Sequence, residues 1–451
     1  MLPTFDESVH NKLAHLLAST PLERQLLEDL LRTLSEKQKI VAKEPEQIYL
    51  DGAATPSEPE KTSSETTSSE KNVTKVNVRM NMMKKRKIIQ SHFDDLEQYY
   101  LELKVKTSNE EEMESNRCQF RQSIGKITSY SGLRQVSTFS YSSESPSGLN
   151  IVSSIEFNRN AELFTIAGVK KKIQMYDYEI MMDNPTGLHF PIAEMQCNAK
   201  ISAVHWNTYR THLLASCDYE GVVQLWDACL GTSTKKFEEH EKRCWSVCFN
   251  YMDPNVLASG SDDAKVKLWS INCKDSVATL ATKVNVCSVH FNPESRFHLA
   301  LGSADHCVHY YDLRNASKPL MVLQGHKKAV SYVKYVSGSE LVSASTDSSL
   351  RLWNLKDAHC TRTFTGHQNE KNFVGLDVKD DFITCGSESS GIFVYYKLLS
   401  KPLIVHQFGK DGPNSNEVDG NDFISSVCWK KKSNVLLAAN SQGIVKVMEL
   451  T

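Results

Sequence analysis

The stretch EHEKRCWSVCFNYMDPNVLASGSDDAKVKLWS, which runs from Glu239 to Ser270, decides how this chain folds. It contains three short apolar runs of strand length: Trp245–Phe249, Val256–Gly260 and Lys265–Trp269. Polar and apolar residues alternate in the last run, as they do in a strand with one buried face. Gly, Ser and Asp residues, which favour hairpin turns, separate the second run from the third. The stretch therefore predicts one small antiparallel sheet.

The same pattern recurs from residue 151 to the C-terminus. An aromatic residue, or a methionine in the last unit, closes the third strand of each unit: Tyr176, Trp226, Trp269, Tyr311, Trp353, Tyr395 and Met448. The spacings of 50, 43, 42, 42, 42 and 53 residues are close to the roughly 40–45 residues of WD-type repeats. A closed ring of small sheets buries faces that one sheet alone cannot bury. We therefore predict an all-β seven-bladed WD-repeat propeller over residues 151–451, preceded by a mainly helical, partly disordered N-terminal region.

Histidines and aspartates recur at fixed places in the units: His240, His326 and His367, with Asp218, Asp262, Asp305 and Asp347. Buried polar groups need hydrogen-bond partners, so we expect these residues to brace the blades. No Ser/His/Asp or metal-ligand set stands outside these positions, which argues against a propeller hydrolase. The sequence thus predicts no catalytic residue, no metal site and no cofactor.

The first 50 residues have a helical pattern of leucines. Leu27, Leu34 and Val41 share one heptad position, but Lys37 interrupts the seam. A coiled-coil segment, which would make the chain a homo- or hetero-oligomer, and a lone amphipathic helix both fit this pattern. Residues 51–79 contain little to bury and many Ser, Thr and Glu residues. They are therefore predicted to be a disordered linker open to phosphorylation.

Residues 80–116 combine a basic cluster with a second helix. The four adjacent cations resemble a nuclear-import signal, with a solvated helix face as the alternative: Lys84, Lys85, Arg86 and Lys87. Apolar residues then recur at helical spacing from Phe93 to Leu103, and the acidic run at 109–114 is expected to end this helix.

Residues 117–150 are predicted to connect the helices to the propeller. Within them, Leu133–Phe139 alternates and is expected to be the outer strand that latches the last blade to the first. The long interruption at 409–422 is rich in Gly, Asn and Asp and is expected to be a surface loop.

Composition limits the compartment and the partners. A formal net charge of -2 excludes a globally basic nucleic-acid binder. The 12 cysteines form no Cys-x-x-Cys pair and sit mostly inside strand runs, as expected of reduced thiols in an intracellular protein. No signal-peptide core and no apolar run that could span a bilayer is visible, so we expect neither secretion nor a membrane role. Nucleus and cytoplasm are the expected locations.

Several runs are more specific than the fold requires. They are Ala215–Gly221, Glu238–Val247, Gly302–His306, His309–Arg314, Gly325–Val333 and Gly366–Leu376. These runs closely resemble the constitutive photomorphogenesis ubiquitin ligases of plants and animals, and the related suppressor-of-phytochrome-A proteins. The resemblance extends from about Met80 to the C-terminus.

The resemblance implies a ligase with a zinc-binding RING, a coiled coil and a propeller that captures Val-Pro motifs of substrates. Transcription factors are among these substrates, which are marked for proteasomal degradation in the nucleus. A RING needs clustered Cys and His ligands, but the first 117 residues contain no cysteine. Whether the chain takes part in an enzyme therefore stays open: the RING is lost, supplied by a partner, or missing from an incomplete gene model.

The repeat also predicts a binding rim around the central channel. Lys200, Arg243 and Ala329 take equivalent positions in three units, and Ser202, Trp245 and Ser331 form a second equivalent set. Loops that open on one end should bring together seven residues: Lys200, Tyr219, Arg243, Trp245, His306, Lys328 and Phe373. Aromatic side chains can wall a slot for a Val-Pro pair, while cations receive flanking acidic residues. The resemblance implies that the matching positions bind substrate peptides.

A second surface is predicted from the run Leu299–Arg314. It is similar to the box by which propellers dock the damaged-DNA-binding adaptor of cullin-4 ligases, and it ends in Asp312 and Arg314. Two functions stay open at this point. One is a substrate receptor for ubiquitin ligation, and the other is a nuclear scaffold that binds the same motifs without ubiquitination.

Overall fold

The computed structural model describes residues 84–105, 110–141, 150–409 and 422–451. The predicted N-terminal helix and linker, residues 1–79, lie outside the described residues, as does almost all of the 409–422 loop.

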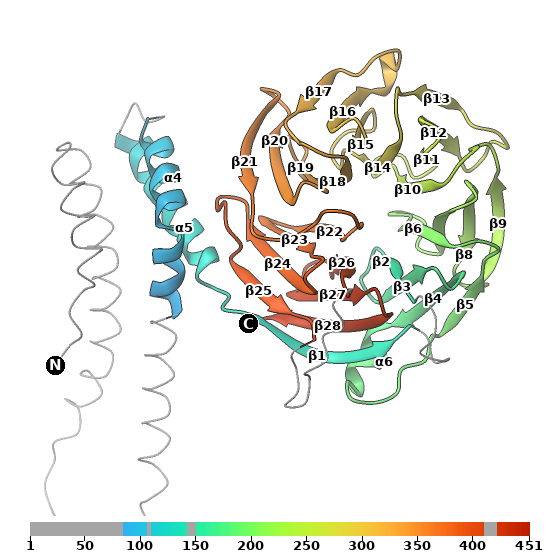
Figure 1. Cartoon of the computed structure of the whole chain (residues 1–451), viewed down its shortest axis with the longest axis horizontal. Helices are drawn as coiled ribbons and strands as arrows, with labels where there is room; N and C mark the ends of the chain where they lie inside the picture. Colours follow the sequence, from blue (N-terminus) through green and yellow to red (C-terminus); the bar gives the residue numbers. More distant parts are fainter. Residues whose placement is uncertain (1–83, 106–109, 142–149, 410–421) are drawn as a thin grey trace, which may run out of the picture. The chain divides into compact units, whose positions relative to one another are not determined.

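Seven four-stranded antiparallel sheets form a ring, which confirms the predicted propeller (Figure 1). Residues from the first strand of every sheet line a cavity at the centre of the ring, which we call the central channel. We number the sheets as blades 1 to 7 along the chain. Blade 1 contains β2 (Val152–Phe157), β3 (Leu163–Gly168), β4 (Lys172–Asp177) and β5 (Ala193–Gln196). Blade 2 contains β6 (Ile201–Trp206), β7 (Leu213–Asp218), β8 (Val223–Asp227) and β9 (Thr232–Phe237). Blade 3 contains β10 (Cys244–Phe249), β11 (Val256–Ser261), β12 (Lys265–Ser270) and β13 (Ala278–Ala281).

The remaining blades repeat this order. Blade 4 contains β14 (Val286–Phe291), β15 (His298–Ser303), β16 (Cys307–Asp312) and β17 (Met321–Gln324). Blade 5 contains β18 (Val330–Ser337), β19 (Glu340–Ser345), β20 (Ser349–Asn354) and β21 (His359–Phe364). Blade 6 contains β22 (Leu376–Lys379), β23 (Phe382–Gly386), β24 (Gly391–Tyr396) and β25 (Ile404–Gln407). Blade 7 contains β26 (Ile424–Trp429), β27 (Val435–Asn440), β28 (Ile444–Leu450) and β1 (Leu133–Ser140).

The latch strand was correctly predicted. β1 pairs antiparallel with β28, so the outer strand of the last blade comes from the segment that precedes the first blade. Phe139 of β1 lies 5.0 Å from the ring of Tyr176 in blade 1. The latch therefore joins the two ends of the ring by backbone pairing and by packing.

The first strand of each blade lines the channel, and it carries a bulge near its start in six blades. In β10, Cys244 pairs with Ser261 and Ser246 with Gly260, so Trp245 has no partner. The same shift leaves five other residues unpaired: Ser153, Ser202, Cys287, Ser331 and Ser425. A bulge changes the direction of a side chain. The predicted equivalence of Ser202, Trp245 and Ser331 is therefore confirmed, and its physical basis is this bulge.

A buried hydrogen-bond chain braces blade 3. Trp269 Nε1 donates to Ser259 Oγ at 2.8 Å, and Ser259 Oγ lies 2.8 Å from His240 Nε2. His240 Nδ1 lies 2.8 Å from Asp263 Oδ2. Since a serine hydroxyl has only one proton, it donates to His240 Nε2 while it accepts from the indole, and His240 then donates from Nδ1 to Asp263. The bracing role predicted for His240 is confirmed.

Blade 5 repeats this chain with Trp353, Ser343, His326 and Asp347. One detail of the prediction was wrong. The bracing aspartate of blade 3 is Asp263, because Asp262 instead accepts a bond from the exposed Asn285 side chain. His367 is buried and bonds the Tyr395 hydroxyl at 2.9 Å, which confirms its bracing role; its partner is a tyrosine that stands where blades 3 and 5 have tryptophan.

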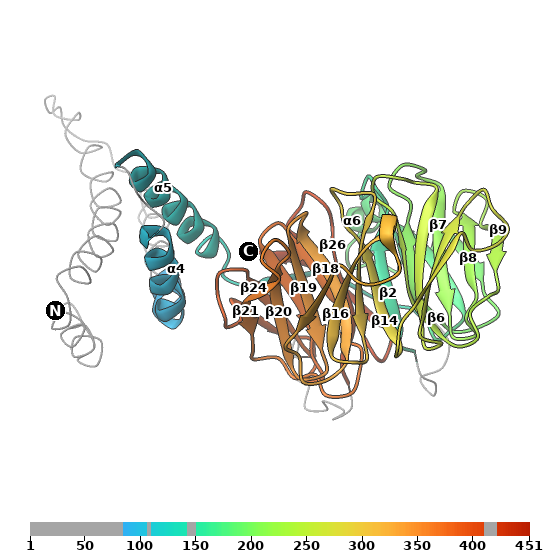
Figure 2. The same cartoon turned by 90° about the horizontal axis from the view of Figure 1, so that it is seen from above.

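Helices lie before the propeller and between two of its strands (Figure 2). Residues 84–91 are helical, and α4 (Phe93–Val105) and α5 (Glu110–Ile127) follow. The acidic run begins α5 rather than ending a helix, as expected for carboxylates near the positive end of a helix dipole. Within blade 1, α6 covers Tyr178–Asp183, and the side chain of Asp177 caps its start. In blade 4, a 3-10 turn covers Leu313–Asn315.

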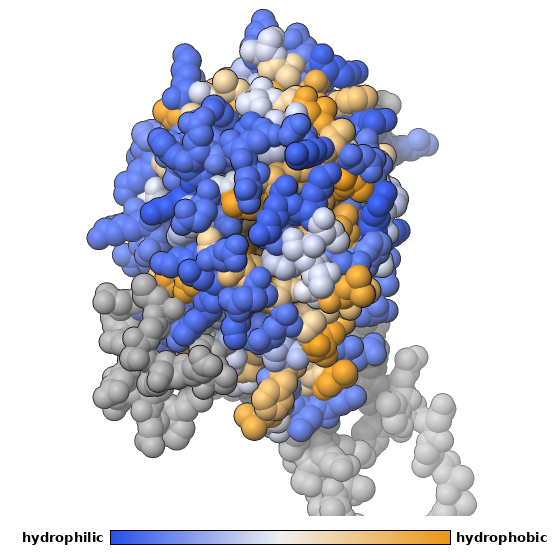
Figure 3. All heavy atoms as spheres, turned by 90° about the vertical axis from the view of Figure 1, so that its right-hand side faces the viewer, coloured by the Kyte–Doolittle hydropathy of each residue, from blue (hydrophilic) through white to orange (hydrophobic). Residues whose placement is uncertain are grey.

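The outer surface is mostly polar, as Figure 3 shows for the edge that carries β9 and β13. Exposed apolar side chains on the molecule include Leu230 and Val277, and four on the segment between β4 and β5: Ile180, Leu188, Phe190 and Ile192.

Candidate functional site

Four aromatic rings meet at one mouth of the central channel, and we call them the aromatic cluster. Trp245 and Phe373 are stacked, with ring centroids 4.8 Å apart and planes 27° apart. Tyr219 lies 5.4 Å from Trp245, and Tyr332 lies edge-on 5.9 Å from Phe373. Trp245 and Tyr332 also line the channel cavity. The cluster joins side chains from blades 2, 3 and 5 and from the segment that leads into blade 6.

The bulge in β10 explains how Trp245 reaches this position, because the unpaired residue is freed from the ladder. Phe373 lies in the segment between β21 and β22. The Glu388 carboxylate holds this segment by accepting the backbone N–H groups of residues 370, 371 and 372, at 3.0, 2.8 and 2.7 Å. Burial alone would raise the pKa of Glu388, but these bonds outweigh it and lower the pKa. Glu388 is therefore ionised and fixes the base of the Phe373 loop.

Cations surround the cluster. The Arg243 guanidinium lies over the Tyr219 ring at 5.3 Å. Lys200 and Arg243 are both exposed. They hold equivalent positions in their blades, because the backbone carbonyl of each accepts a bond, at 3.0 Å, from the N–H of the residue that follows the second strand. Lys328 is exposed on the segment that leads into β18. An apolar aromatic floor is thus flanked by accessible positive charge.

His306 is the predicted aromatic residue of the rim that no ring contact joins to the cluster in the described part of the chain. It is exposed at the tip of the β15–β16 hairpin with a φ of 72°. The backbone explains the difference from Tyr219: Ala304, not His306, is the position equivalent to Tyr219, because its N–H bonds the carbonyl of Asn285 at 3.0 Å.

Two residues of the site were not predicted from the sequence. Tyr332 follows the bulged Ser331, so the signal was an aromatic residue one place after a position already singled out. No sequence motif points to Glu388, because the loop that it holds lies next to it only in the folded protein.

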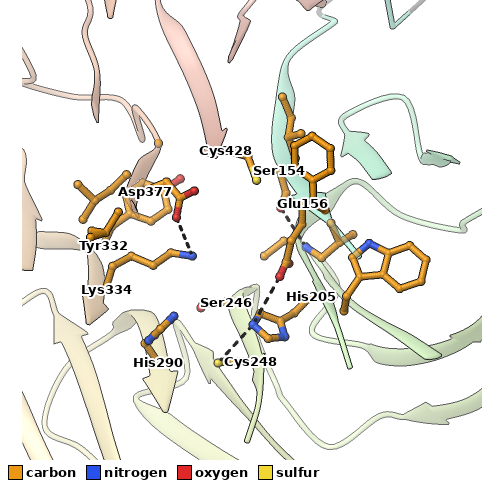
Figure 4. Close-up of a pocket in the computed structure, with 18 of the residues that line it drawn as sticks. Ser154, Glu156, His205, Ser246, Cys248, His290, Tyr332, Lys334, Asp377 and Cys428 are labelled. Atoms are coloured by element: carbon orange, nitrogen blue, oxygen red, sulfur yellow. Dashed lines mark hydrogen bonds and ion pairs between the residues drawn. The ribbon is translucent and has the colours of Figure 1, made fainter. Parts of the chain in front are cut away.

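A ring of titratable residues lines the middle of the channel, one from each inner strand: Glu156, His205, Cys248, His290, Lys334, Asp377 and Cys428 (Figure 4). Together with the residues above and below, they enclose a cavity of about 420 Å³. His205 Nε2 lies 3.7 Å from Glu156 Oε1 and 3.6 Å from Cys248 Sγ. On the other side of the channel, in the adjacent blades 5 and 6, Lys334 Nζ lies 3.8 Å from Asp377 Oδ1.

Burial controls the charge of this ring. It raises the pKa of Glu156 to about 8, and Lys334 and Lys431 only partly oppose the shift. Burial, together with the same two lysines, lowers the pKa of His205 to about 3. Glu156 and His205 are therefore mostly uncharged at neutral pH.

The predicted adaptor-docking pair lies away from this mouth, in blade 4. Arg314 is exposed, and its Nη2 donates to Asp312 Oδ2 at 2.6 Å, while its guanidinium lies 5.0 Å from the centre of the Phe297 ring. Hydrogen bonds from Arg314 lower the pKa of Asp312 to about 2.

The other sequence predictions concern the chain outside the rim. The predicted nuclear-import residues Lys84–Lys87 are helical and exposed, an arrangement that fits both an import signal and a solvated helix face. Within the described ranges, no group of three or more His, Cys, Asp or Glu side chains is arranged to hold a metal ion. In those same ranges, no helix is long and apolar enough to cross a membrane.

Comparison with known proteins gives several matches. A sequence profile described as the nucleolar protein 10-like, N-terminal domain matches residues 247–397. The chain is 45% identical over 381 residues to the E3 ubiquitin-protein ligase COP1 of Pisum sativum, which covers 81% of this chain and 56% of that protein. It is 47% identical over 312 residues to the Protein SUPPRESSOR OF PHYA-105 1 of Arabidopsis thaliana, covering 67% of this chain and 30% of that protein. It is 34% identical over 325 residues to the WD repeat-containing protein RUP2 of Arabidopsis thaliana, covering 66% of this chain and 87% of that protein.

A closed ring of seven blades with repeated Trp–Ser–His–Asp bonding defines a WD-repeat propeller protein. The chain belongs to the WD-repeat family that includes COP1, SUPPRESSOR OF PHYA-105 1 and RUP2, which confirms the resemblance seen in the sequence. It spans just over half of the length of the COP1 relatives that it matches, at 56% and 57%.

Proposed function

We propose that this protein is the substrate-recognition component of a ubiquitin ligase and that its aromatic cluster binds acidic peptides containing a Val-Pro pair. The observation that carries the proposal is the stacked Trp245–Phe373 pair between exposed cations at the channel mouth. Proline and valine side chains pack well on aromatic faces, and Arg and Lys favour carboxylates next to the motif. Relatives named as ubiquitin ligases support this assignment.

The proposal includes the partners that a receptor needs. Arg314, exposed beside Asp312, is the proposed contact for the damaged-DNA-binding adaptor of cullin-4 ligases. Lys84–Lys87 is the proposed nuclear-import signal, and the N-terminal segment is proposed to pair with a second helix. Transcription factors are the proposed class of substrate.

Calorimetry with an acidic Val-Pro peptide tests the proposed groove. Trp245→Ala should weaken binding by roughly 2 kcal/mol or more, as the loss of an interface hot spot does, which is on the order of a thirtyfold loss in affinity. Arg243→Ala and Lys200→Ala should weaken it less, and their effects should shrink at high salt because exposed charges are screened. Tyr209→Ala is the matched control, since Tyr209 is an exposed aromatic residue outside the cluster.

Thermal melting of each variant separates binding from folding. Wild-type affinity of a folded Trp245→Ala protein would contradict the proposed groove. The second candidate is a scaffold that binds the same motifs without ubiquitination, and it is supported by the relative RUP2, which the chain covers to 87% and whose name gives a WD-repeat protein rather than a ligase. Reconstitution with ubiquitin, its charging enzymes and the cullin-4 adaptor distinguishes the two, because only a receptor supports ubiquitin chains on a bound substrate.

A further inference from the structure

The end of the channel opposite Trp245 is basic. The inner strands run in the same direction along the channel, since neighbouring blades bond each other at positions one residue apart in the repeat; Ser246 Oγ accepts from Val289 N at 3.1 Å, and Ser288 Oγ accepts from Val333 N at 3.2 Å. Trp245 stands at the start of β10, so the turns that follow the inner strands lie at the other end. Three of these turns, in the adjacent blades 6, 7 and 1, line the cavity with four cations and one acid: Lys379, Lys431, Lys432, Arg159 and Asp380. We call these five residues the distal mouth.

The charges at the distal mouth are poorly neutralised. Lys431 and Lys432 are exposed, and no carboxylate in the described part of the chain pairs with either of them. Arg159 lies over the ring of Tyr209 at 5.4 Å rather than beside an acid. Other exposed lysines do pair, as Lys126 does with Asp381 at 2.8 Å. In a protein with a formal net charge of -2, unpaired positive charge therefore gathers at this opening, as it also does around the aromatic cluster.

The interior behind this opening does not repel an anion strongly. Lys334 projects into the channel and faces Asp377, so these two charges offset each other (Figure 4). Glu156 is mostly protonated at neutral pH because burial raises its pKa to about 8. Lys431 acts on Glu156 and also on His205, which places its charge near the inner ring as well as at the mouth.

We infer that the distal mouth binds a soluble small molecule that carries two or more adjacent phosphate groups. Lysine ammonium groups and an arginine fork are suited to phosphate oxygens. The distal mouth opens into the channel cavity of about 420 Å³, which also reaches Trp245 and has the size of a small-ligand site; the cations of the distal mouth come from three neighbouring blades rather than from one extended groove. These features favour a compact polyanion over an acidic peptide, which would need a track for its backbone.

The site is distinct from the proposed peptide groove because the two lie at opposite ends of the channel. Calorimetry on the full chain with tripolyphosphate, pyrophosphate and orthophosphate as probes tests the proposal. Affinity should rise with the number of phosphates and fall with added salt, because the attraction is electrostatic. Lys431→Ala combined with Lys432→Ala should weaken tripolyphosphate binding at least tenfold, since it removes the two unpaired ammonium groups.

A double variant of two exposed lysines that do not line the cavity, Lys274→Ala with Lys318→Ala, should bind like the wild type. Trp245→Ala should also leave tripolyphosphate binding unchanged, so failure of the peptide groove and failure of this site can be told apart. Equal loss in the control variant would show nonspecific charge attraction and overturn the proposal. An acidic peptide that binds here more tightly than tripolyphosphate would overturn it, and so would binding only to vesicles that contain a phosphorylated inositol lipid.

Discussion

Ser259→Ala and Ser216→Ala form a matched pair that tests the blade-bracing chain. Both serines are buried and both accept a bond from a tryptophan Nε1 at 2.8 Å, Ser259 from Trp269 and Ser216 from Trp226. Only Ser259 also donates to a histidine, His240, which continues the chain to Asp263. The same substitution therefore removes two bonds in blade 3 and one in blade 2.

The expected magnitudes follow from the groups left without partners. A buried donor or acceptor that loses its partner costs about 1–3 kcal/mol. Ser216→Ala leaves one such group and should lower the free energy of unfolding by about 2 kcal/mol. Ser259→Ala leaves both the Trp269 indole and His240 Nε2, and should lower it by about 4 kcal/mol. In a domain of this size, 1 kcal/mol corresponds to a Tm shift of about 2 °C, so falls of about 4 and 8 °C are expected.

Differential scanning calorimetry and urea unfolding measure the two variants against the wild type. In a Ser259→Ala background, replacing His240 by leucine should cost less than it does in the wild type, because the two residues belong to one chain. Equal losses for Ser216→Ala and Ser259→Ala would refute the reasoning, since they would show that the His240 bond adds nothing. Ser343→Ala in blade 5 should behave like Ser259→Ala.

Three further outcomes are expected. Because the folded-state pKa of Glu156, about 8, exceeds its ordinary value of 4.5, stability should fall as the pH rises from about 4.5 to about 8, by no more than about 5 kcal/mol. Glu156→Gln should flatten this fall in urea unfolding, and an unchanged pH profile would contradict the burial of that carboxyl. Arg314→Ala should reduce capture of the cullin-4 adaptor while Lys356→Ala, at the equivalent place in blade 5, should not; equal capture by both would exclude this contact. Replacing Lys84–Lys87 by alanine should leave a fluorescent fusion in the cytoplasm, and persistent nuclear accumulation would instead favour the solvated helix face.

The ring of blades could be predicted because the same sequence pattern, that of a small sheet with buried faces, occurs seven times along the chain. Each unit repeats three buried strands and a closing aromatic residue, so the pattern is stronger than any single strand. The fourth strands of blades 1, 3 and 4 were not visible, because β5, β13 and β17 have only four residues each and expose half of them. Short exposed strands carry little hydrophobic signal.

Errors of one residue arose where the turn chemistry was ambiguous. Asp262 and Asp263 are adjacent and both suit a turn, and only the fold shows that Asp263 reaches His240. The acidic run before α5 was misread for a related reason, since acidic residues both break apolar patterns and stabilise helix starts.

Part of the rim could be predicted, because some residues at the channel mouth differ from those that the fold alone requires. Five of the six bulged residues are serine or cysteine, and all four serines donate to nearby backbone carbonyls; Ser331 donates to Ala344 and Ser425 to Ala439. A small hydroxyl residue therefore satisfies what the fold requires at the bulge. Trp245 is the exception, and its ring instead stacks on Phe373 at the channel mouth. An aromatic residue where the fold needs only a serine is best explained by a ligand, which is why the peptide groove is placed on Trp245.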